Sequence, residues 1–183
     1  MFNKIIAMLI IIILIPVFLI IGATIYLADG FPILYWSKRI GTNNKEFFMP
    51  KFRTMKNNSP IIATHELLNP EKYLIKFGSF LRKTSLDELP QFYSIIRGDL
   101  IIIGPRPALF NQKDLIELRT KYGINKMKFG ITGWAQVKGR DDLSIEEKVS
   151  LEKYYKNHKS SILDIQIFFM TLRQIIISKG ISH

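Results

Sequence analysis

The hydrophobic pattern of the chain begins with an unbroken apolar stretch. Residues 5–28 contain no charged side chain, and Lys4 and Asp29 flank them. A helix of this length is sufficient for a bilayer hydrocarbon core of roughly 30 Å. The run is too long for a cleaved signal peptide and too apolar for a small soluble domain to cover. The pattern therefore predicts a membrane segment over residues 1–30.

Pro16 lies in the middle of this segment. Proline removes one backbone hydrogen bond and bends a helix. Two geometries are compatible with the pattern: a kinked helix that spans the membrane, and a re-entrant helix–break–helix hairpin that enters and leaves by one face. Both place the following, strongly basic chain on the cytoplasmic side.

Alternation of apolar and polar residues follows the membrane segment. It predicts two short strands, Ile33–Trp36 and Glu46–Phe52, joined as a hairpin by the turn formers at residues 41–44. On the second strand, Lys51 and Arg53 are expected on one face and Phe52 on the other.

The pattern in the next part of the chain is less regular. Lys56–Pro70 is predicted as a loop with a short helix at Thr64–Leu68, and the lone His65 is interpreted as a surface residue. In Glu71–Lys83, an apolar stripe is expected to face the core or the membrane.

Three helices are predicted further along. Ala108–Tyr122 should be helical and end at Gly123. Ser144 and Glu147 have the spacing of a capping box and open a helix through about His158. Ser161–Ile177 is apolar but contains Asp164 and Arg173, which favours a helix in the membrane interface or under the domain.

Composition narrows the class of protein. The 183 residues include 26 Lys and Arg against 15 Asp and Glu, a net charge of +11, so an anionic partner is expected. Apolar residues at 48% argue against disorder, and the absence of cysteine excludes disulfides and thiolate metal sites. No helix-turn-helix, RNA-recognition or zinc pattern accompanies the charge, so no nucleic-acid partner is expected.

The segment Arg82–Pro107 contains the main candidate chemistry. Asp87 and Glu88 are adjacent, and Pro90 must occupy the first turn of any helix, which predicts a helix from about residues 87–89 to Gly98. The positive end of a helix favours ionised carboxylates and can also bind phosphate. An N-cap role for Asp87 is the simpler interpretation of the pair taken alone.

Arg106 strengthens the catalytic interpretation. Pro105 and Pro107 stiffen the loop that carries it, after the apolar run Leu100–Ile103. A stiffly held arginine suits bidentate recognition of phosphate. Together with two carboxylates, it suggests phosphate chemistry assisted by a divalent cation.

Four motifs then point to a known family. SLDELPQ, GDLIIIGPRP, the earlier KFRTM (Lys51–Met55) and the later GITGWAQVKGR (Gly130–Arg140) resemble those of the small monotopic phosphoglycosyl transferases, the bacterial sugar transferase family. They occur in the family's order over nearly the whole chain. The family usually has serine where this chain has Ile15, proline in place of Phe129 and asparagine in place of Lys138.

The resemblance implies a fold and a reaction. The fold is α+β, mainly helical with a small β-hairpin: a monotopic membrane protein with a re-entrant segment over 1–30 and a cytoplasmic catalytic domain over 31–183. The reaction moves a sugar-1-phosphate from a nucleotide sugar, by family habit a uridine one, to polyprenyl phosphate. It implies Mg²⁺ as cofactor, anionic membrane lipids as partners, and the bacterial inner membrane as location, while the oligomeric state stays open.

The resemblance also implies residue roles. Asp87 would be the nucleophile and a metal ligand, and Glu88 would assist the acceptor or the metal. Phosphate-binding residues would be Lys51, Arg106, Arg82 and Arg140; Arg53, Thr132 and Gln136 are the candidates for binding the nucleotide or sugar. Two alternatives remain: a metal-dependent hydrolase of membrane lipid diphosphates, and a basic membrane-anchored scaffold without catalysis.

Overall fold

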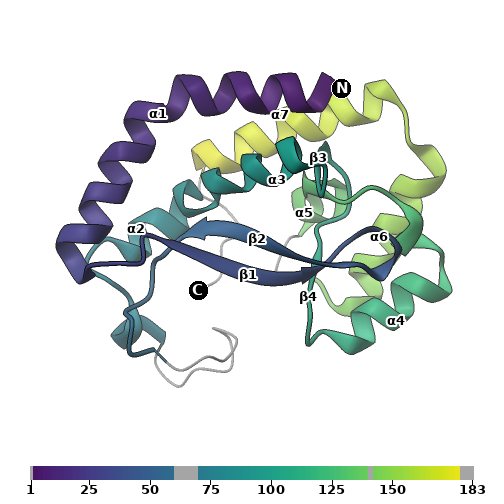
Figure 1. Ribbon diagram of the computed structural model, residues 1–183. Helices are drawn as coiled ribbons and strands as arrows, with labels where there is room; N and C mark the ends of the chain where they lie inside the picture. Colours follow the sequence, from purple (N-terminus) through teal and green to yellow (C-terminus); the bar gives the residue numbers. More distant parts are fainter. Residues whose placement is uncertain (1, 60–69, 140–141, 178–183) are drawn as a thin grey trace.

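The computed structural model describes residues 2–59, 70–139 and 142–177 (Figure 1). It is mostly helical, as the sequence predicts, and it contains two small sheets where the sequence predicts a single β-hairpin. Its α-helices are α1 Phe2–Asp29, α2 Gly78–Lys83, α3 Phe92–Arg97, α4 Lys113–Lys121, α5 Trp134–Lys138, α6 Ile145–His158 and α7 Ser161–Ile177. Its strands are β1 Leu34–Ile40, β2 Glu46–Phe52, β3 Ile101–Ile103, β4 Ala108–Leu109 and β5 Gly130–Thr132. Short 3₁₀ segments are η1 Thr42–Asn44, η3 Pro70–Tyr73, η4 Leu86–Gln91 and η5 Ile124–Lys126.

Helix α1 is continuous and contains Pro16. Figure 1 shows that its axis changes direction about half way along its length. The described residues contain this one helix of sufficient length and apolarity to cross a membrane. The helix–break–helix prediction is therefore wrong in its detail, because a bend takes the place of a non-helical break.

Both halves of α1 pack on the rest of the protein. Near the amino end, Ala7 is buried against Met49, Ile95 and Leu100. Near the other end, Ile21 and Ile25 join a second cluster, whose remaining buried members are Phe52, Ile75 and Leu81. These contacts place the apolar helix over α3 and the end of the β1–β2 hairpin.

The predicted hairpin is present but longer at its first strand. β1 runs from Leu34 to Ile40, beyond the predicted end at Trp36, and pairs antiparallel with β2 along its whole length. In the turn, Asn43 and Asn44 have φ values of 57° and 58°, a region that asparagine tolerates better than most residues. The short strand β4 adds to the other edge of β1.

A second sheet was not predicted. β3 and β5 pair in parallel, with Ile101 opposite Gly130 and Ile103 opposite Thr132. The two backbones approach so closely that a Cβ on Gly130 would lie 2.3 Å from the nitrogen of Gly104. Glycine at this position is therefore explained by close packing of backbone on backbone.

The segment with the two carboxylates differs from the predicted helix. It begins as the 3₁₀ segment η4, which contains Asp87, Glu88 and Pro90, and continues as α3. Ser85 precedes it with φ 57° and provides no side-chain cap. Because Pro90 lacks an N–H group, it is accommodated before the α-helix begins. Gly98, with φ 94°, ends α3 as predicted.

The carboxy-terminal half agrees better with prediction. The capping box of Ser144 and Glu147 is formed, and α6 extends to His158. α7 occupies Ser161–Ile177. The predicted helix Ala108–Tyr122 is wrong at its start, because Ala108 and Leu109 form β4 and α4 begins only at Lys113. The helix proposed for Thr64–Leu68 and the surface position proposed for His65 lie outside the described residues.

Candidate active site

Glu88 lies between two cations that come from distant parts of the chain. Lys51, at the end of β2, approaches Glu88 with 2.9 Å between Nζ and Oε1. The Arg106 guanidinium, from the loop after β3, donates to the same carboxylate oxygen through Nη2 and to the Ile131 carbonyl through Nη1 at 3.2 Å. The structure thus brings together three of the residues singled out in the sequence.

The charges in this cluster explain the ionisation of Glu88. Burial acts to raise the pKa of its carboxyl, but the positive charges of Arg106 and Lys51 outweigh burial and hold the pKa well below its usual range. Burial in turn lowers the pKa of Lys51, while Glu88 acts to raise it. Glu88 is therefore an ionised partner that keeps two partly buried cations in place.

Asp87 is in a different situation, although it is the adjacent residue. Its side chain is only 7% exposed, and no described residue donates a hydrogen bond to its carboxylate. Burial raises its pKa from 3.8 to about 6, against the opposing influence of Lys51, Arg82 and Arg106. A desolvated carboxylate that is still ionised at neutral pH suits nucleophilic or metal-binding chemistry.

Arg82 lies at the edge of this cluster. Its Nε donates to Thr54 Oγ1 at 2.9 Å, and its charge lowers the pKa of Asp87. The active-site cluster, defined here as Lys51, Asp87, Glu88 and Arg106, therefore has a further cation within electrostatic range.

Arg53 lies apart from the active-site cluster. β2 ends at Phe52, so the alternation that was expected to align Arg53 with Lys51 does not continue. The Arg53 guanidinium instead pairs with the Asp29 carboxylate at the end of α1. It also donates to backbone carbonyls around that junction, those of Asp29, Gly30, Pro32 and Met55. Its role in binding nucleotide or sugar stays a prediction.

Thr132 is the last residue of β5 in the second sheet, and Gln136 lies in the following helix α5. The hydroxyls of Thr132 and Thr171 are 2.7 Å apart, a contact between β5 and α7. The amide oxygen and nitrogen of Gln136 are buried and have no hydrogen-bond partner among the described residues. An unpaired buried amide is costly, which makes Gln136 a reasonable candidate for contact with a polar ligand. Arg140 lies outside the described residues.

The donor set allows a metal ion only with help from the substrate. Within residues 2–59, 70–139 and 142–177, no three His, Cys, Asp or Glu side chains gather into a potential metal site. Mg²⁺ is, however, commonly held by one or two carboxylates together with substrate phosphates and water. Asp87, with no described hydrogen-bond donor, fits such a partial site.

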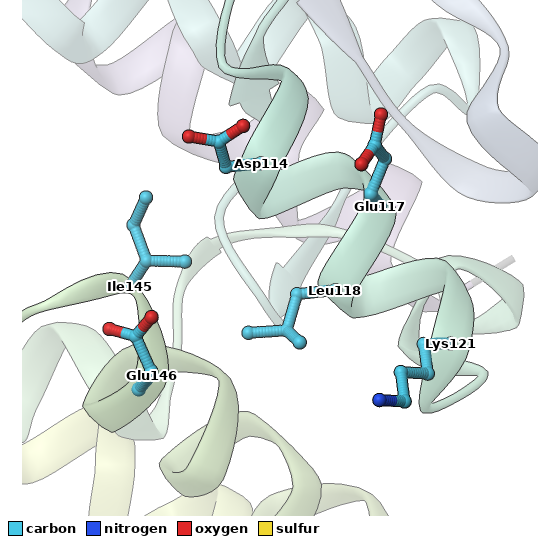
Figure 2. A pocket seen from close by; sticks show the side chains of 6 residues that line it. All are labelled: Asp114, Glu117, Leu118, Lys121, Ile145 and Glu146. Carbon is cyan, nitrogen blue, oxygen red and sulfur yellow. The ribbon is translucent and has the colours of Figure 1, made fainter.

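A surface hollow of about 420 Å³ lies elsewhere, between α4 and the start of α6 (Figure 2). Its lining comprises Asp114, Glu117, Leu118, Lys121, Ile145 and Glu146. None of the predicted site residues contributes to it.

The sequence interpretation missed a buried ion pair behind the Arg106 loop. Arg119 of α4 and Glu152 of α6 are 3% and 2% exposed and are joined through two hydrogen bonds. The available signal was the helical period: Arg119 follows the core residue Leu115 by four positions, and Glu152 follows the core residue Val149 by three. A charge on the apolar face of each helix indicates a buried pair.

A buried carboxylate, Asp87, next to the partly buried Glu88 and two cations, in a chain with a long apolar helix, is typical of a membrane-associated enzyme that handles phosphate groups. Residues 1–178 match the model of a protein family described as bacterial sugar transferase. The chain therefore belongs to the bacterial sugar transferase family and is a phosphoglycosyl transferase.

Named relatives agree with this assignment. The chain is 38% identical to the uncharacterized sugar transferase EpsL of Bacillus subtilis, over 88% of this chain and 78% of EpsL. It is 34% identical to the UDP-glucose:undecaprenyl-phosphate glucose-1-phosphate transferase of Escherichia coli, over 97% of this chain and 40% of that protein. It is 31% identical to an Aeromonas hydrophila N-acetylgalactosaminephosphotransferase that uses undecaprenyl phosphate, over 90% of this chain and 40% of that protein.

Proposed function

We propose that this chain transfers a sugar-1-phosphate from a nucleotide sugar, with UDP as the expected nucleotide, to polyprenyl phosphate. The product is a polyprenyl-diphosphate sugar, the first membrane intermediate of a bacterial glycan. The observation that carries the proposal is the buried Asp87 carboxylate with its raised pKa, beside a Glu88 neutralised by Lys51 and Arg106. The names of the relatives, which act on undecaprenyl phosphate, support this choice of acceptor.

The proposed reaction proceeds in two displacements at the β-phosphorus of the donor. An Asp87 carboxylate oxygen attacks this phosphorus, and the bond to the bridging oxygen breaks, so that nucleoside monophosphate leaves with the electron pair. A phosphate oxygen of the lipid acceptor then attacks the same phosphorus and releases the Asp87 carboxylate. Lys51 and Arg106 stabilise the negative charge on the phosphate oxygens in both steps.

Charge balance explains why Glu88 and Asp87 have different proposed roles. Arg106 and Lys51 already share Glu88, so the cluster is close to neutral before the substrate binds. Glu88 keeps Lys51 and Arg106 in place in the absence of substrate. When the donor binds, its diphosphate can replace Glu88 as the anionic partner of these two cations. Asp87 would also hold Mg²⁺, which, when bound, neutralises the diphosphate and improves the leaving group.

We also propose that α1 enters and leaves the membrane by the same face. Ile102 N donates to Asn3 Oδ1 at 3.3 Å near the start of α1, and Arg53 pairs with Asp29 at its end. A helix that crossed a hydrocarbon core of about 30 Å would have its ends on opposite sides, where one domain could not contact both. Contacts at both ends therefore support a bent, re-entrant helix.

The same arrangement supports a location at the cytoplasmic face of the inner membrane. Large apolar side chains are exposed along α1 and α7, among them Leu9, Ile13, Leu19, Ile162, Ile165 and Phe169. The net charge of +11 favours anionic headgroups, with about 1 kcal/mol for each well-placed Lys or Arg. A lipid-anchored acceptor and a soluble donor could then meet at the active-site cluster.

The test uses the full chain in nanodiscs, Mg²⁺, and a panel of nucleotide sugars labelled in the β-phosphate. With polyprenyl phosphate present, we expect continuous release of nucleoside monophosphate and label in the lipid. Without the acceptor, we expect only a stoichiometric burst and label on the protein. Continuous release without acceptor would indicate hydrolysis, and no release with any donor would refute the proposal.

A further inference from the structure

The backbone in and just before the Arg106 loop is held by side chains from three separate elements. In the loop, Arg119 of α4 donates through Nη2 to the Arg106 carbonyl at 2.9 Å, and Arg39 of β1 donates through Nη1 to the Pro107 carbonyl at 3.2 Å. Just before the loop, Tyr155 of α6 donates through Oη to the carbonyl of Ile103, the last residue of β3, at 3.4 Å. The Gly130 amide donates to the carbonyl of Pro105 at 2.9 Å. Prolines on both sides of Arg106 already restrict its backbone torsions, so these bonds fix where its side chain begins.

Arg119 is itself held on two sides. Its Nε donates to Glu152 Oε2 at 2.8 Å, and its Nη2 contacts Glu152 Oε1 as well as the Arg106 carbonyl. The Phe129 ring lies against the same group, with 5.4 Å between the guanidinium carbon and the ring centroid. A planar guanidinium clamped by a carboxylate and a ring has little freedom to rotate.

Stability alone is a weak explanation for this pair. Burying two charges costs several kcal/mol per ion, and apolar residues of similar volume often replace such pairs without loss of folding free energy. α4 and α6 already pack through apolar residues, including Leu115 and Val149. What an apolar replacement could not supply is a fixed hydrogen-bond donor at the Arg106 carbonyl.

We propose that the buried Arg119–Glu152 pair is a positioning device for Arg106, which holds the guanidinium where it stabilises the phosphate in the transition state. This inference rests on the proposed function, because it assigns Arg106 to the transferred phosphate. Arg119 and Glu152 are positioning residues, since they reach the substrate only through Arg106. The path runs from Glu152 to Arg119, from Arg119 to the Arg106 backbone, and from Arg106 to the active-site cluster.

The test replaces both charges together, as Arg119→Met with Glu152→Leu, so that no unpaired charge remains buried. We expect kcat to fall by at least about tenfold, since a displacement of about 1 Å in a catalytic group can cost 10²-fold. KM for the donor should change much less. Val149→Ala is the matched control, because it removes apolar packing between α4 and α6 but keeps the Arg119–Glu152 pair and the bond from Arg119 to the Arg106 carbonyl; it should lower the melting temperature and leave kcat unchanged.

A double-mutant cycle with Arg106→Lys separates positioning from general damage. If the Arg119–Glu152 pair acts through Arg106, adding the paired replacement to Arg106→Lys should lower kcat by less than about threefold relative to Arg106→Lys alone. The inference would be overturned if the decreases in kcat of the paired variant and of Arg106→Lys multiplied fully when combined. An unchanged kcat in the variant with Arg119→Met and Glu152→Leu would overturn it as well. Should the paired variant fail to fold, Glu152→Asp takes its place with the same expectations.

The outcome for the wild-type chain distinguishes this inference from the proposed function. Wild-type transfer combined with an unaffected paired variant overturns the positioning role alone. Absence of wild-type transfer with every donor overturns the proposed function and the positioning role together.

Discussion

Two clusters of charged groups lie at the end of β2, and they use neighbouring residues in different ways. Lys51 belongs to the active-site cluster, whereas Arg53 belongs to a junction cluster formed with Asp29 and Asn57. In the junction cluster each charged group is paired. Arg53 contacts the Asp29 carboxylate and several backbone carbonyls, and the backbone N–H of Asn57 donates to Asp29 Oδ2 at 2.9 Å. In the active-site cluster, Asp87 is buried without a donor from any described residue.

This difference is the one expected between a structural cluster and the proposed catalytic one. Full pairing stabilises a fold, so the junction cluster has the form expected for a connection between α1 and the rest of the protein. A buried carboxylate with a raised pKa lowers stability, and such costs are typical of functional sites. The comparison predicts that substitutions in the active-site cluster lower turnover and that substitutions in the junction cluster lower stability.

The largest effect is expected for Asp87→Asn. Because Asp87 is the proposed nucleophile, its loss should reduce kcat by more than about 10³-fold and abolish label on the protein. The melting temperature should stay equal or rise, because a pKa raised from 3.8 to about 6 corresponds to about 3 kcal/mol of destabilisation at neutral pH. Activity and thermal unfolding are measured on the same nanodisc sample.

Asp114→Asn is the control for this substitution, since Asp114 is an exposed carboxylate on α4. It should leave both kcat and the melting temperature unchanged. If Asp87→Asn retains a tenth of the wild-type rate, the covalent role of Asp87 is wrong.

Arg106→Lys comes next in expected size. Lysine keeps the charge but cannot hold Glu88 and the Ile131 carbonyl at once through a planar fork. We expect kcat to fall by about 10- to 100-fold, with the melting temperature nearly unchanged. The control is Arg97→Lys, since the Arg97 side chain is exposed and pairs with Asp99, outside the active-site cluster. Wild-type kinetics for Arg106→Lys would show that Arg106 takes no part in the chemistry.

The pH dependence should reveal the same carboxylate. A raised pKa means that Asp87 becomes protonated as the pH falls through about 6, so kcat/KM should drop about tenfold per pH unit below that value. Glu88 raises the pKa of Asp87 and Lys51 lowers it. Glu88→Gln should therefore shift the acidic limb to lower pH, and Lys51→Met should shift it to higher pH. Identical limbs in both variants would mean that another group controls the profile.

The sequence predicted the hairpin and the capped helix α6 because each has a strong local signal. The β1–β2 turn contains glycine and two asparagines, and the Ser144–Glu147 box lies directly before a long helix. The parallel β3–β5 pair has no such signal. A short apolar run such as Leu100–Ile103 does not distinguish a strand from a helix, and its partner strand is distant in the sequence.

The candidate site was also predicted only in part, because local motifs indicate its residues but not the contacts between distant segments. The motifs indicated Lys51, Glu88 and Arg106, which the structure places in contact. The expected alignment of Arg53 with Lys51 assumed that the strand continues past Phe52, and the strand's end is determined by tertiary contacts of Arg53 with the end of α1. Pairing between Arg119 and Glu152 likewise depends on how two helices pack, which local patterns do not specify.

The smallest effect on turnover is expected for Arg53→Lys, which tests the junction cluster directly. Lysine cannot donate at once to Asp29 and to the surrounding carbonyls, so buried acceptors lose their partners. For a chain of this size, each kcal/mol corresponds to roughly 2–4 °C, and we expect the melting temperature to fall by about 5 °C or more. Measured per mole of folded protein, kcat and the donor KM should stay within about threefold of wild type, because Arg53 lies apart from Asp87. A normal melting temperature with a tenfold higher donor KM would reverse the assignment and support Arg53 as a nucleotide- or sugar-binding residue.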